Sequence, residues 1–377
     1  MVLHNGTTRG GCMLKSVTRT IGILTSGGDC PGLNAAIRGV CRAAYDRYNM
    51  SIIGIANGYR GLIEADARLL KPEDFSGILT RGGTILGTSR EKPFKSRKGE
   101  YDSEVAQDKV EIIKENYKKL NLDCLVVLGG NGTNTTGYLL SKEGLNVIGL
   151  PKTIDNDIVG TDITFGFHSA VSIATEAIDR LHSTAHSHNR VMVIELMGHK
   201  AGWLALYAGV AGGGDIILIP EIPYNMEAIT RHLLKRARDG KSFSIVVVAE
   251  GALSVEEAQM EKKERKKYRE KTAQPSIGYR VARKIEEATG METRVTVLGY
   301  LQRGGIPSAW DRVLATTFGT AAAELLARGE YGKMVCMRGN EVGSVSLEEV
   351  AGKYKAVPLD HYMIDTARSV GTCMGDE

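Results

Sequence analysis

Two aspartates in the stretch 150-LPKTIDNDIVGTD-162 are candidates for acid–base chemistry. Asp155 and Asp157 lie two residues apart, just past an apolar run, and in a turn their carboxylates can converge. One could then be the base for a substrate hydroxyl while the other serves a magnesium ion. Phosphoryl transfer needs this division of work, because its catalysis is mostly positioning and charge neutralisation. The alternative is a pair of helix-capping aspartates, an interpretation that suits Asp162 better than Asp155.

Two glycine-rich stretches could hold phosphate groups. In 25-TSGGDCPGLNAAIRG-39, paired glycines including Gly28 let backbone amides approach a ligand, and Pro31 is placed to begin a helix. The stretch lacks the GK[ST] ending of a P-loop, and a tight strand–helix turn explains it equally well. In 128-LGGNGT-133, glycines end an apolar run before a helix. Asn131 stands there at a position that would suit a metal-binding carboxylate.

Several arginines flank the ends of apolar runs. Arg90 follows a glycine-rich stretch, and Arg190, Arg294 and Arg303 each adjoin a predicted strand. Arginine presents a planar fork of donors that matches a phosphate dianion, although a single arginine is more often part of a surface ion pair. Several of them around one site favour a substrate that carries phosphate. Glu250, at another strand end, would suit a sugar hydroxyl.

Short apolar runs alternate with helical patterns from residue 19 onward. The predicted strands are continuously apolar and rich in Val and Ile, which is typical of strands buried on both faces of a parallel sheet. They cover residues 20–26, 51–57, 123–129, 145–151, 190–197, 215–221, 243–250 and 294–300. Helical patterns occupy residues 31–48, 103–120, 168–185, 226–238 and 310–329. This alternation predicts an α/β fold of two lobes, each a doubly wound, mainly parallel sheet flanked by helices.

Polar residues follow six of these runs directly. In doubly wound sheets, ligands bind at the carboxyl ends of the strands. Because all six groups stand directly after a predicted strand, they predict one cleft between the lobes. The groups are Gly27–Asp29, Gly129–Gly132, Thr153–Asp157, Met197–His199, Ala249–Glu250 and Tyr300–Arg303. We place the boundary between the lobes at residue 157, giving lobes 1–157 and 158–330. Residues 331–377 form a tail, and part of this C-terminal region could rejoin the first lobe.

Composition excludes several classes of protein. The 377-residue chain has a net charge of +4, too small to indicate a nucleic-acid partner. One run, 261-EKKERKKYREK-271, has seven Lys or Arg against three Glu, and we interpret it as a solvated helix or surface insertion. A nucleic-acid patch is the alternative. No apolar stretch approaches the ~20 residues that span a bilayer. None of the six cysteines, among them Cys12 and Cys124, forms a CxxC pair, which indicates a reduced, cytoplasmic protein.

With these residues in view, the chain resembles the 6-phosphofructokinases from about residue 19 to about residue 330. The motifs that carry the resemblance are TSGGDCPGLNAAIRG, GGTILGTSR, GGNGT, PKTIDND, SHNRV, MGHKAGW, VAEG and METRVTVLGYLQRGG. The resemblance implies transfer of a phosphoryl group from ATP, with Mg²⁺, to the 1-hydroxyl of fructose 6-phosphate, a reaction of glycolysis. It also implies that the first lobe binds the nucleotide and the second binds the sugar phosphate.

The family pattern implies a role for each matching residue. Asp155 would be the general base, oriented by Thr153, and Asn131 and Asp157 would hold the metal. The nucleotide would be held by Gly28, Arg90, Gly130, Asn131, Gly132 and Thr133. The sugar phosphate would be held by Thr153, Asp155, Met197, Gly198, His199, Glu250, Tyr300 and Arg303. Arg190 and Arg294 match arginines that the family supplies from a neighbouring subunit, so a homotetramer or homodimer with shared active sites is implied.

Three positions depart from the best-known ATP-dependent members. Asn131 replaces a metal-associated aspartate and contributes no negative charge. Lys152 is glycine in many ATP-dependent members and lysine in pyrophosphate-dependent ones, whereas Gly132 leaves room for ATP where the pyrophosphate pattern has aspartate. His199 stands where many members have arginine, so Lys152 could take over stabilisation of the transition-state charge. This Gly/Lys combination resembles the mixed group of the family and favours ATP.

Two other functions stay open at this point. One is a pyrophosphate-dependent phosphofructokinase, which Lys152 suggests. The other is a catalytically silent paralogue that binds sugar phosphate and regulates an active partner, which Asn131 and His199 suggest. The intact set of Asp155, Asp157 and Glu250 argues for a working enzyme.

Overall fold

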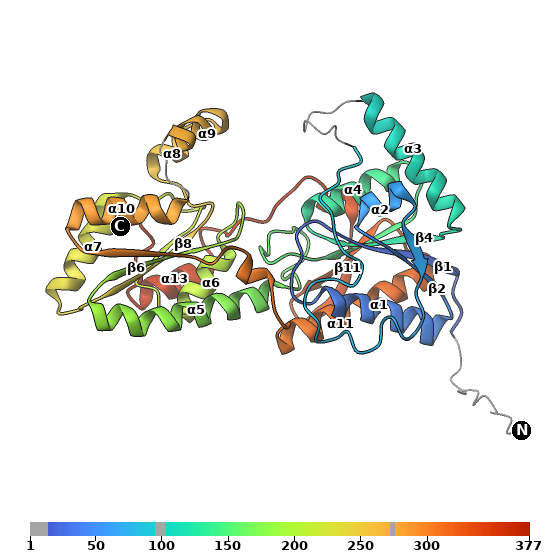
Figure 1. Ribbon diagram of the computed structural model, residues 1–377, viewed down its shortest axis with the longest axis horizontal. Helices are drawn as coiled ribbons and strands as arrows, with labels where there is room; N and C mark the ends of the chain where they lie inside the picture. Colours follow the sequence, from blue (N-terminus) through green and yellow to red (C-terminus); the bar gives the residue numbers. More distant parts are fainter. Residues whose placement is uncertain (1–13, 95–102, 272–275) are drawn as a thin grey trace, which may run out of the picture. The chain divides into compact units, whose positions relative to one another are not determined.

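A computed structural model describes residues 14–94, 103–271 and 276–377. Cys12 lies outside these residues. The chain divides into two compact units, each assembled from separate segments (Figure 1). Unit 1 contains Met1–Gly28, Leu33–Pro151 and Arg312–Gly352, and unit 2 contains Asp29–Gly32, Lys152–Asp311 and Lys353–Glu377. The chain thus passes from unit 1 to the main part of unit 2 after Pro151. The sequence analysis placed this boundary at residue 157. In the region predicted as a tail, residues up to Gly352 belong to unit 1 and the rest to unit 2.

Unit 1 is built on a seven-stranded sheet with the order β11-β10-β5-β4-β1-β2-β3. The five central strands are parallel, and the edge strands β3 and β11 are antiparallel to their neighbours. Bounds are β1 Thr20–Ser26, β2 Ser51–Ile55, β3 Ala67–Leu69, β4 Cys124–Gly129, β5 Val147–Pro151, β10 Lys333–Arg338 and β11 Glu341–Ser346. Every residue of β4 and β5 is buried, as expected for continuously apolar strands covered on both faces.

Helices cover both faces of this sheet. They are α1 Leu33–Tyr48, α2 Tyr59–Glu64, α3 Ser103–Lys119, α4 Asn131–Lys142, α12 Leu347–Val350 and α11 Ala309–Arg328, of which residues 309–311 belong to unit 2. Figure 1 shows α1 and α11 on one face and α2, α3 and α4 on the other. Gly39 and Gly319 let α1 and α11 pack closely, because a Cβ on Gly319 would lie 2.6 Å from the backbone nitrogen of Val40.

Unit 2 is built on a four-stranded, fully parallel sheet with the order β7-β8-β6-β9. Bounds are β6 Val191–Leu196, β7 Ile216–Leu218, β8 Ser244–Ala249 and β9 Thr293–Val297. The helices α5 Phe167–His188 and α6 Trp203–Ala211 cover one face, and α7 Met226–Arg238 and α10 Ile277–Thr289 cover the other (Figure 1). The core between the sheet and the latter pair includes Val193, Val246, Ile229, Leu233, Val281 and Ile285, all at most 1% exposed.

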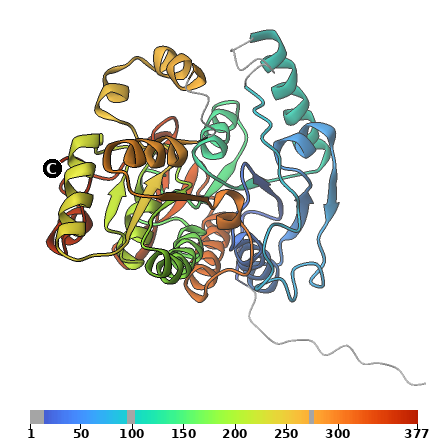
Figure 2. The same ribbon diagram turned by 60° about the vertical axis from the view of Figure 1, so that its left-hand side comes forward.

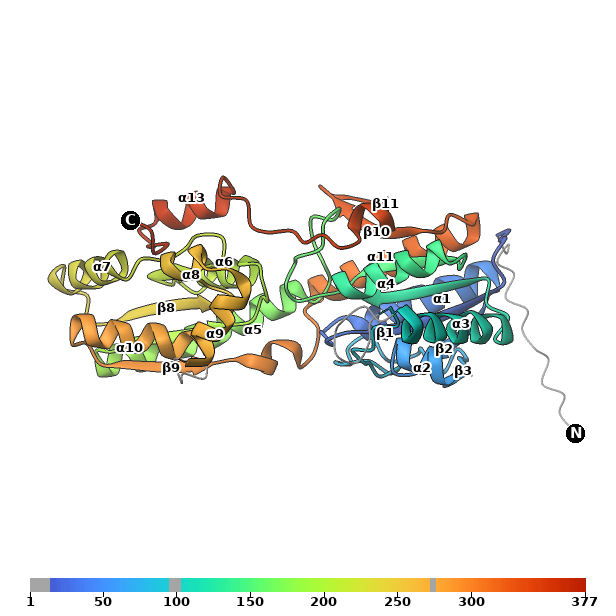
Figure 3. The same cartoon turned by 90° about the horizontal axis from the view of Figure 1, so that it is seen from above.

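Two further features of unit 2 lie outside the sheet layers. The short helices α8 Val255–Gln259 and α9 Lys262–Lys271 form an arm that stands away from the sheet (Figure 2). The run predicted as a solvated helix is therefore helical over 262–271. The helix α13 Tyr362–Ser369 of the C-terminal segment lies beside α6 (Figure 3). A 3₁₀ turn, η1 Gly299–Arg303, follows β9.

The predicted α/β class is confirmed, and all eight predicted strands are present with ends shifted by a few residues. The sequence analysis missed β3, β10 and β11. Of these, β3 and β11 are largely exposed edge strands without a continuous apolar run. It also missed α6 and α10. None of the described helices is long and apolar enough to cross a membrane.

Candidate active site

In unit 1, the two glycine-rich loops meet at the carboxyl edge of the sheet. β1 and β4 are neighbours, so the residues that follow them lie side by side. The Thr133 hydroxyl donates to the Ser26 carbonyl at 3.2 Å, and the Tyr59 hydroxyl donates to the Thr133 carbonyl at 2.9 Å. Gly129 must be glycine, because a Cβ there would lie 2.2 Å from the side chain of Thr133. These contacts bring Gly28 and the Gly130–Thr133 loop into one region, as predicted.

The loop that carries Arg90 joins the same region. The Gly27 amide donates to the Ser89 carbonyl at 2.9 Å, and the Thr88 hydroxyl donates to the Gly27 carbonyl at 2.7 Å. Arg90 itself is exposed. All predicted nucleotide-binding residues of unit 1 therefore gather around three loops at one edge of the sheet.

Asn131 and Gly132 are the first two residues of α4, with Gly130 at the N-cap. The first amides of a helix have no intrahelical partner and attract anions, so this helix start suits a phosphate group. A Cβ added to Gly132 would meet no atom within 4 Å. Packing of the protein therefore does not require glycine at this position, and its absent side chain leaves open space beside the helix start.

In unit 2, the residues after β5 form an irregular turn that carries the two aspartates. The Asp155 amide donates to the Thr153 hydroxyl at 3.1 Å, and the Thr164 hydroxyl closes the loop by donating to the Thr153 carbonyl at 2.8 Å. Between the aspartates, Asn156 has a φ of 50°, in the left-handed region that asparagine tolerates. We call residues 153–164 the catalytic turn, after the role predicted for Asp155.

Asp155 has the environment of a base. Burial raises its pKa to about 6, and the charges of Asp157 and Glu250 act in the same direction, opposed by Arg303. Two buried polar atoms in this cluster, Asp155 Oδ1 and Arg303 Nε, lack a hydrogen-bond partner among the described residues. Because buried polar atoms are normally paired, these two are suited to meeting polar groups of a ligand.

Lys152 lies in the same cluster and is only 3% exposed. Burial lowers its pKa, while the nearby Cys30 and Asp155 act to raise it and Arg303 acts to lower it. Arg303 donates to the Asp29 carbonyl at 3.0 Å, which ties the end of η1 to the short segment after β1. The predicted residues Lys152, Asp155 and Arg303 are therefore brought together within unit 2.

The predicted sugar-binding residues gather at the carboxyl edge of β6, β8 and β9. Glu250 Oε1 accepts from the Gly198 amide at 3.2 Å and from the His199 amide at 2.7 Å. The Met197 amide donates to Gln302 Oε1 at 3.3 Å. One oxygen of Glu250 is thus used to shape the loop 197–203, which we call the sugar loop. Tyr300 is 75% exposed at the same edge.

Arg190 and Arg294 do not join this group within one chain. They lie at the amino ends of β6 and β9, at the opposite edge of the parallel sheet, and both pair with Glu292. The Arg190 Nε atom is 2.7 Å from Glu292 Oε2. Their position is compatible with the expectation that a second subunit supplies them.

Sequence analysis missed three residues that shape the site. Gln302 is fully buried and holds the sugar loop, although the motif that contains it was recognised. Asn156 shapes the turn between the aspartates, and its position between two carboxylates was a usable signal. Lys355 donates to the catalytic turn from the C-terminal segment, and nothing in its sequence neighbourhood indicated this.

The residues also allow a test of the magnesium prediction. Among the described residues, no three His, Cys, Asp or Glu side chains cluster as a metal site. Magnesium is usually bound by one or two protein oxygens together with substrate phosphates and waters, so a ready-made cage is not required. Asn131, in unit 1, and Asp157, in unit 2, offer oxygen ligands of the right kind.

In a comparison with known protein families, residues 20–326 match the family described as Phosphofructokinase.

The chain belongs to the phosphofructokinase family.

Among its relatives, the ATP-dependent 6-phosphofructokinase of Spirochaeta thermophila is 75% identical over 364 residues, covering 97% of this chain and all of that protein. The ATP-dependent 6-phosphofructokinase 3 of Bacteroides thetaiotaomicron is 54% identical over 355 residues, covering 94% of this chain and 99% of that protein. The predicted family and enzyme class are therefore confirmed.

Solved structures show the same fold. The phosphofructokinase of Saccharomyces cerevisiae superposes with a TM-score of 0.75 at 31% identity, over 88% of this chain and 45% of that one. The pyrophosphate-dependent phosphofructokinase of Marinobacter aquaeolei superposes with a TM-score of 0.76 at 25% identity, over 94% of this chain and 88% of that one.

Proposed function

We propose that the chain transfers the γ-phosphoryl group of ATP to the 1-hydroxyl of fructose 6-phosphate, with Asp155 as the general base. The observation that carries the proposal is the Asp155 carboxylate, which lies in one cluster with Lys152 and Arg303 and whose buried Oδ1 has no hydrogen-bond partner among the described residues. A base with a pKa of about 6 is ionised at neutral pH and still basic enough to accept a hydroxyl proton. The ATP-dependent relatives support the same reaction.

The proposal divides the substrates between the units. The helix start at Asn131 and the loops around Gly28 and Arg90 bind the nucleotide, and the sugar loop with Glu250, Tyr300 and Arg303 binds the sugar phosphate. Asn131 and Asp157 would hold Mg²⁺, which neutralises phosphate charge when it is bound. Asn131 can serve through its amide oxygen, and Asp157 and the nucleotide phosphates supply the negative charge that asparagine lacks.

Lys152 is the proposed stabiliser of charge in the transition state. It is buried next to Asp155, whereas His199 is exposed and contributes its backbone amide to Glu250. A buried ammonium interacts more strongly with developing charge than an exposed imidazole does. Replacement Lys152→Met should lower kcat by about 100-fold or more while changing the KM for fructose 6-phosphate little. Steady-state kinetics with unchanged turnover would contradict this role.

ATP is the proposed donor because of the space at Gly132. A Cβ added to Gly132 would meet no atom within 4 Å, so glycine leaves the helix start accessible, whereas an aspartate there would crowd and repel a nucleotide α-phosphate. The test is a coupled assay for fructose 1,6-bisphosphate with Mg²⁺ and fructose 6-phosphate, with ATP and pyrophosphate supplied separately. Turnover with ATP alone supports the proposal. Turnover with pyrophosphate alone would mean that Lys152 is the better guide to the donor.

The same assay decides the silent-paralogue alternative. A folded protein that binds fructose 6-phosphate but turns over neither donor would overturn the proposed activity. Gly132→Asp is the matched variant, because a Cβ at this position would meet no atom within 4 Å. It should lose turnover with ATP while keeping the thermal stability of the wild type.

We also propose a homotetramer or homodimer with shared active sites, in the cytoplasm. Arg190 and Arg294 are partly exposed and lie apart from the other sugar-binding residues of their own chain. Mixing inactive Asp155→Asn chains with inactive Arg294→Ala chains should restore part of the activity if sites are shared. The five described cysteines are all free, as in a reducing compartment.

A further inference from the structure

The C-terminal segment 353–361, which we call the tail strap, contacts the two loops that form the site of unit 2. Lys355 makes most of these contacts. Its three ammonium hydrogens match three acceptors: the Thr161 carbonyl at 2.9 Å, the Asp162 carbonyl at 2.9 Å and Asn156 Oδ1 at 3.3 Å. Its backbone amide also donates to the Asp157 carbonyl at 2.7 Å. One residue of the strap therefore holds two parts of the catalytic turn, residues 156–157 and 161–162.

The same residue contacts the sugar loop. The Trp203 indole nitrogen donates to the Lys355 carbonyl at 2.9 Å, and the Lys355 ammonium lies 5.2 Å from the centre of the Trp203 ring. Glu221 Oε1 strengthens this junction, because it accepts from the Gly202 amide at 3.0 Å and from the Val357 amide at 2.9 Å. The strap is thus hydrogen-bonded to both loops.

The contacts on Asn156 matter most for Asp155. Asn156 has positive φ and lies directly between the two aspartates, so its conformation sets the directions of both neighbouring side chains. Within the turn, Asn156 is held by the Thr164 amide at 3.1 Å and by its own bond to the Asp162 carbonyl at 3.4 Å. Lys355 adds a charged donor from outside the turn. Charge-assisted hydrogen bonds are roughly twice as strong as neutral ones.

We propose that Lys355 is a positioning residue for phosphoryl transfer, which fixes the catalytic turn through Asn156 so that Asp155 faces the substrate hydroxyl. This inference rests on the proposed role of Asp155 as general base. Lys355 has no contact with the sugar-binding side chains Glu250 or Arg303 among the described interactions. Loss of its side chain should therefore weaken the chemical step more than sugar binding.

The test is the variant Lys355→Met, which keeps an unbranched chain against Trp203 but removes the charge and all three donors. We expect kcat to fall about 10- to 100-fold, because a displacement of about 1 Å is enough to cause such a loss. The KM for fructose 6-phosphate should stay within about twofold. Lys353→Met is the matched control, since Lys353 is an exposed lysine on the same strap, and it should behave as the wild type.

A chemical rescue separates positioning from general stabilisation. In Lys355→Ala, added methylammonium or ethylammonium should raise kcat in proportion to its concentration, and it should leave Lys353→Ala unchanged. If Lys355→Met does not fold, Lys355→Gln replaces it, because glutamine keeps a donor in the site. A kcat within twofold of wild type in the folded variant, or an equal rise of KM without loss of kcat, would overturn the inference.

The proposed function can fail separately. If the wild type forms no fructose 1,6-bisphosphate, or Asp155→Asn keeps its turnover, the role of Asp155 is wrong and the inference falls with it. If the wild type is active, Asp155→Asn is inactive and Lys355→Met is fully active, only the inference about Lys355 is overturned.

Discussion

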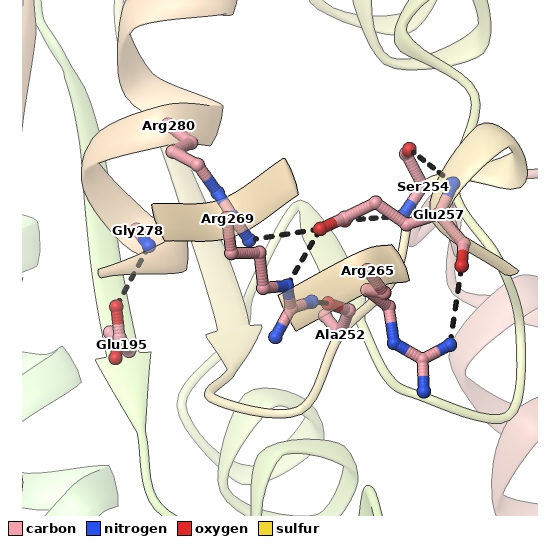
Figure 4. Close-up of polar contacts among 8 residues, drawn as sticks. All are labelled: Glu195, Ala252, Ser254, Glu257, Arg265, Arg269, Gly278 and Arg280. Atoms are coloured by element: carbon pink, nitrogen blue, oxygen red, sulfur yellow. Dashed lines mark hydrogen bonds and ion pairs between the residues drawn. The ribbon is translucent and has the colours of Figure 1, made fainter. Parts of the chain in front are cut away.

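Two carboxylates of unit 2, the partly buried Asp155 and the buried Glu257, have opposite surroundings. Glu257 is in α8, at the base of the arm, and its side chain is 4% exposed. Figure 4 shows the donors around it: Ser254 closes a capping box, Arg269 Nε lies 2.7 Å from Oε1, and Arg280 Nη2 lies 3.4 Å from the same oxygen. Burial acts to raise the pKa of Glu257, but these donors together hold it below its ordinary value.

Asp155 is partly buried and has few donors around its carboxylate. Its Oδ1 has no hydrogen-bond partner within the described part of the chain, and its pKa is raised to about 6 by burial and by the neighbouring carboxylates. Glu257 is therefore held as a permanent anion that fastens the arm, whereas Asp155 is a destabilised anion that gains by accepting a proton. The difference indicates that the donors around a desolvated carboxylate decide whether its pKa is lowered, as for Glu257, or raised, as for Asp155.

The largest effect is expected for Asp155→Asn, which removes the base and keeps the shape. Turnover should fall by about 10²- to 10⁴-fold, the usual contribution of a general base. The protein should stay folded, because asparagine has nearly the same shape as aspartate and its amide oxygen can still accept the hydrogen bond from Thr153. Steady-state kinetics on protein with a wild-type circular dichroism spectrum is the measurement. Retained turnover would mean that Asp155 is not the general base and does not differ in function from Glu257.

The pH dependence of stability should have opposite signs at the two sites. The pKa of Asp155 is raised from 3.8 to about 6, so its contribution to stability is present below pH 4 and is lost as pH rises through 6. Asp155→Asn should therefore be more stable than wild type at pH 7, by up to about 3 kcal/mol, and equal to it near pH 4. Urea unfolding at both pH values tests this.

Turnover should follow the same ionisation. Because the base must be ionised, log kcat/KM should fall with a slope of about one below pH 6. An acid limb of kcat/KM that begins only near pH 4 would show that Asp155 is not desolvated.

Glu257 has a lowered pKa, so its contribution to stability is present at neutral pH and is lost as pH falls below the ordinary glutamate pKa of 4.5.

A smaller effect is expected for Glu257→Gln, the same chemical change at the structural site. Arg269 and Arg280 would lose their anion, and the free energy of unfolding should fall by about 2–3 kcal/mol. Turnover should stay within twofold of wild type, because none of the described partners of Glu257 is a residue proposed to bind substrate. Urea unfolding and the coupled assay check both parts. A loss of turnover at unchanged stability would give Glu257 a functional role instead.

The smallest effect is expected for Glu287→Gln on α10, a surface ion pair. Glu287 and Arg283 are 2.7 Å apart, but their side chains are 60% and 66% exposed. Such pairs contribute little, so stability should change by no more than about 0.5 kcal/mol and turnover should not change. This variant is the baseline for the other two. A loss as large as that of Glu257→Gln would mean that burial does not distinguish these carboxylates.

The sequence was most informative where a pattern is local. The continuous apolar runs predicted all eight of the strands assigned from them, because a strand buried on both faces must be apolar at every position. The polar residues after β1, β4, β6, β8 and β9 were also placed correctly at the carboxyl edges, since parallel strands end at the same side of a sheet. Edge strands such as β11 were missed, because half of that strand faces solvent and its apolar residues are few.

The sequence by itself determined the α/β class, the family and the identities of the residues that can do chemistry, including Asp155 and the Asn131 substitution. Tertiary structure alone decided what those residues experience. The raised pKa of Asp155 comes from burial and from the carboxylates of Asp157 and of Glu250, which follows β8, and its turn is bonded to Lys355, 199 residues beyond Asn156 in the chain. Desolvation and long-range hydrogen bonds depend on which segments surround a group in the fold, and distance along the chain does not encode them.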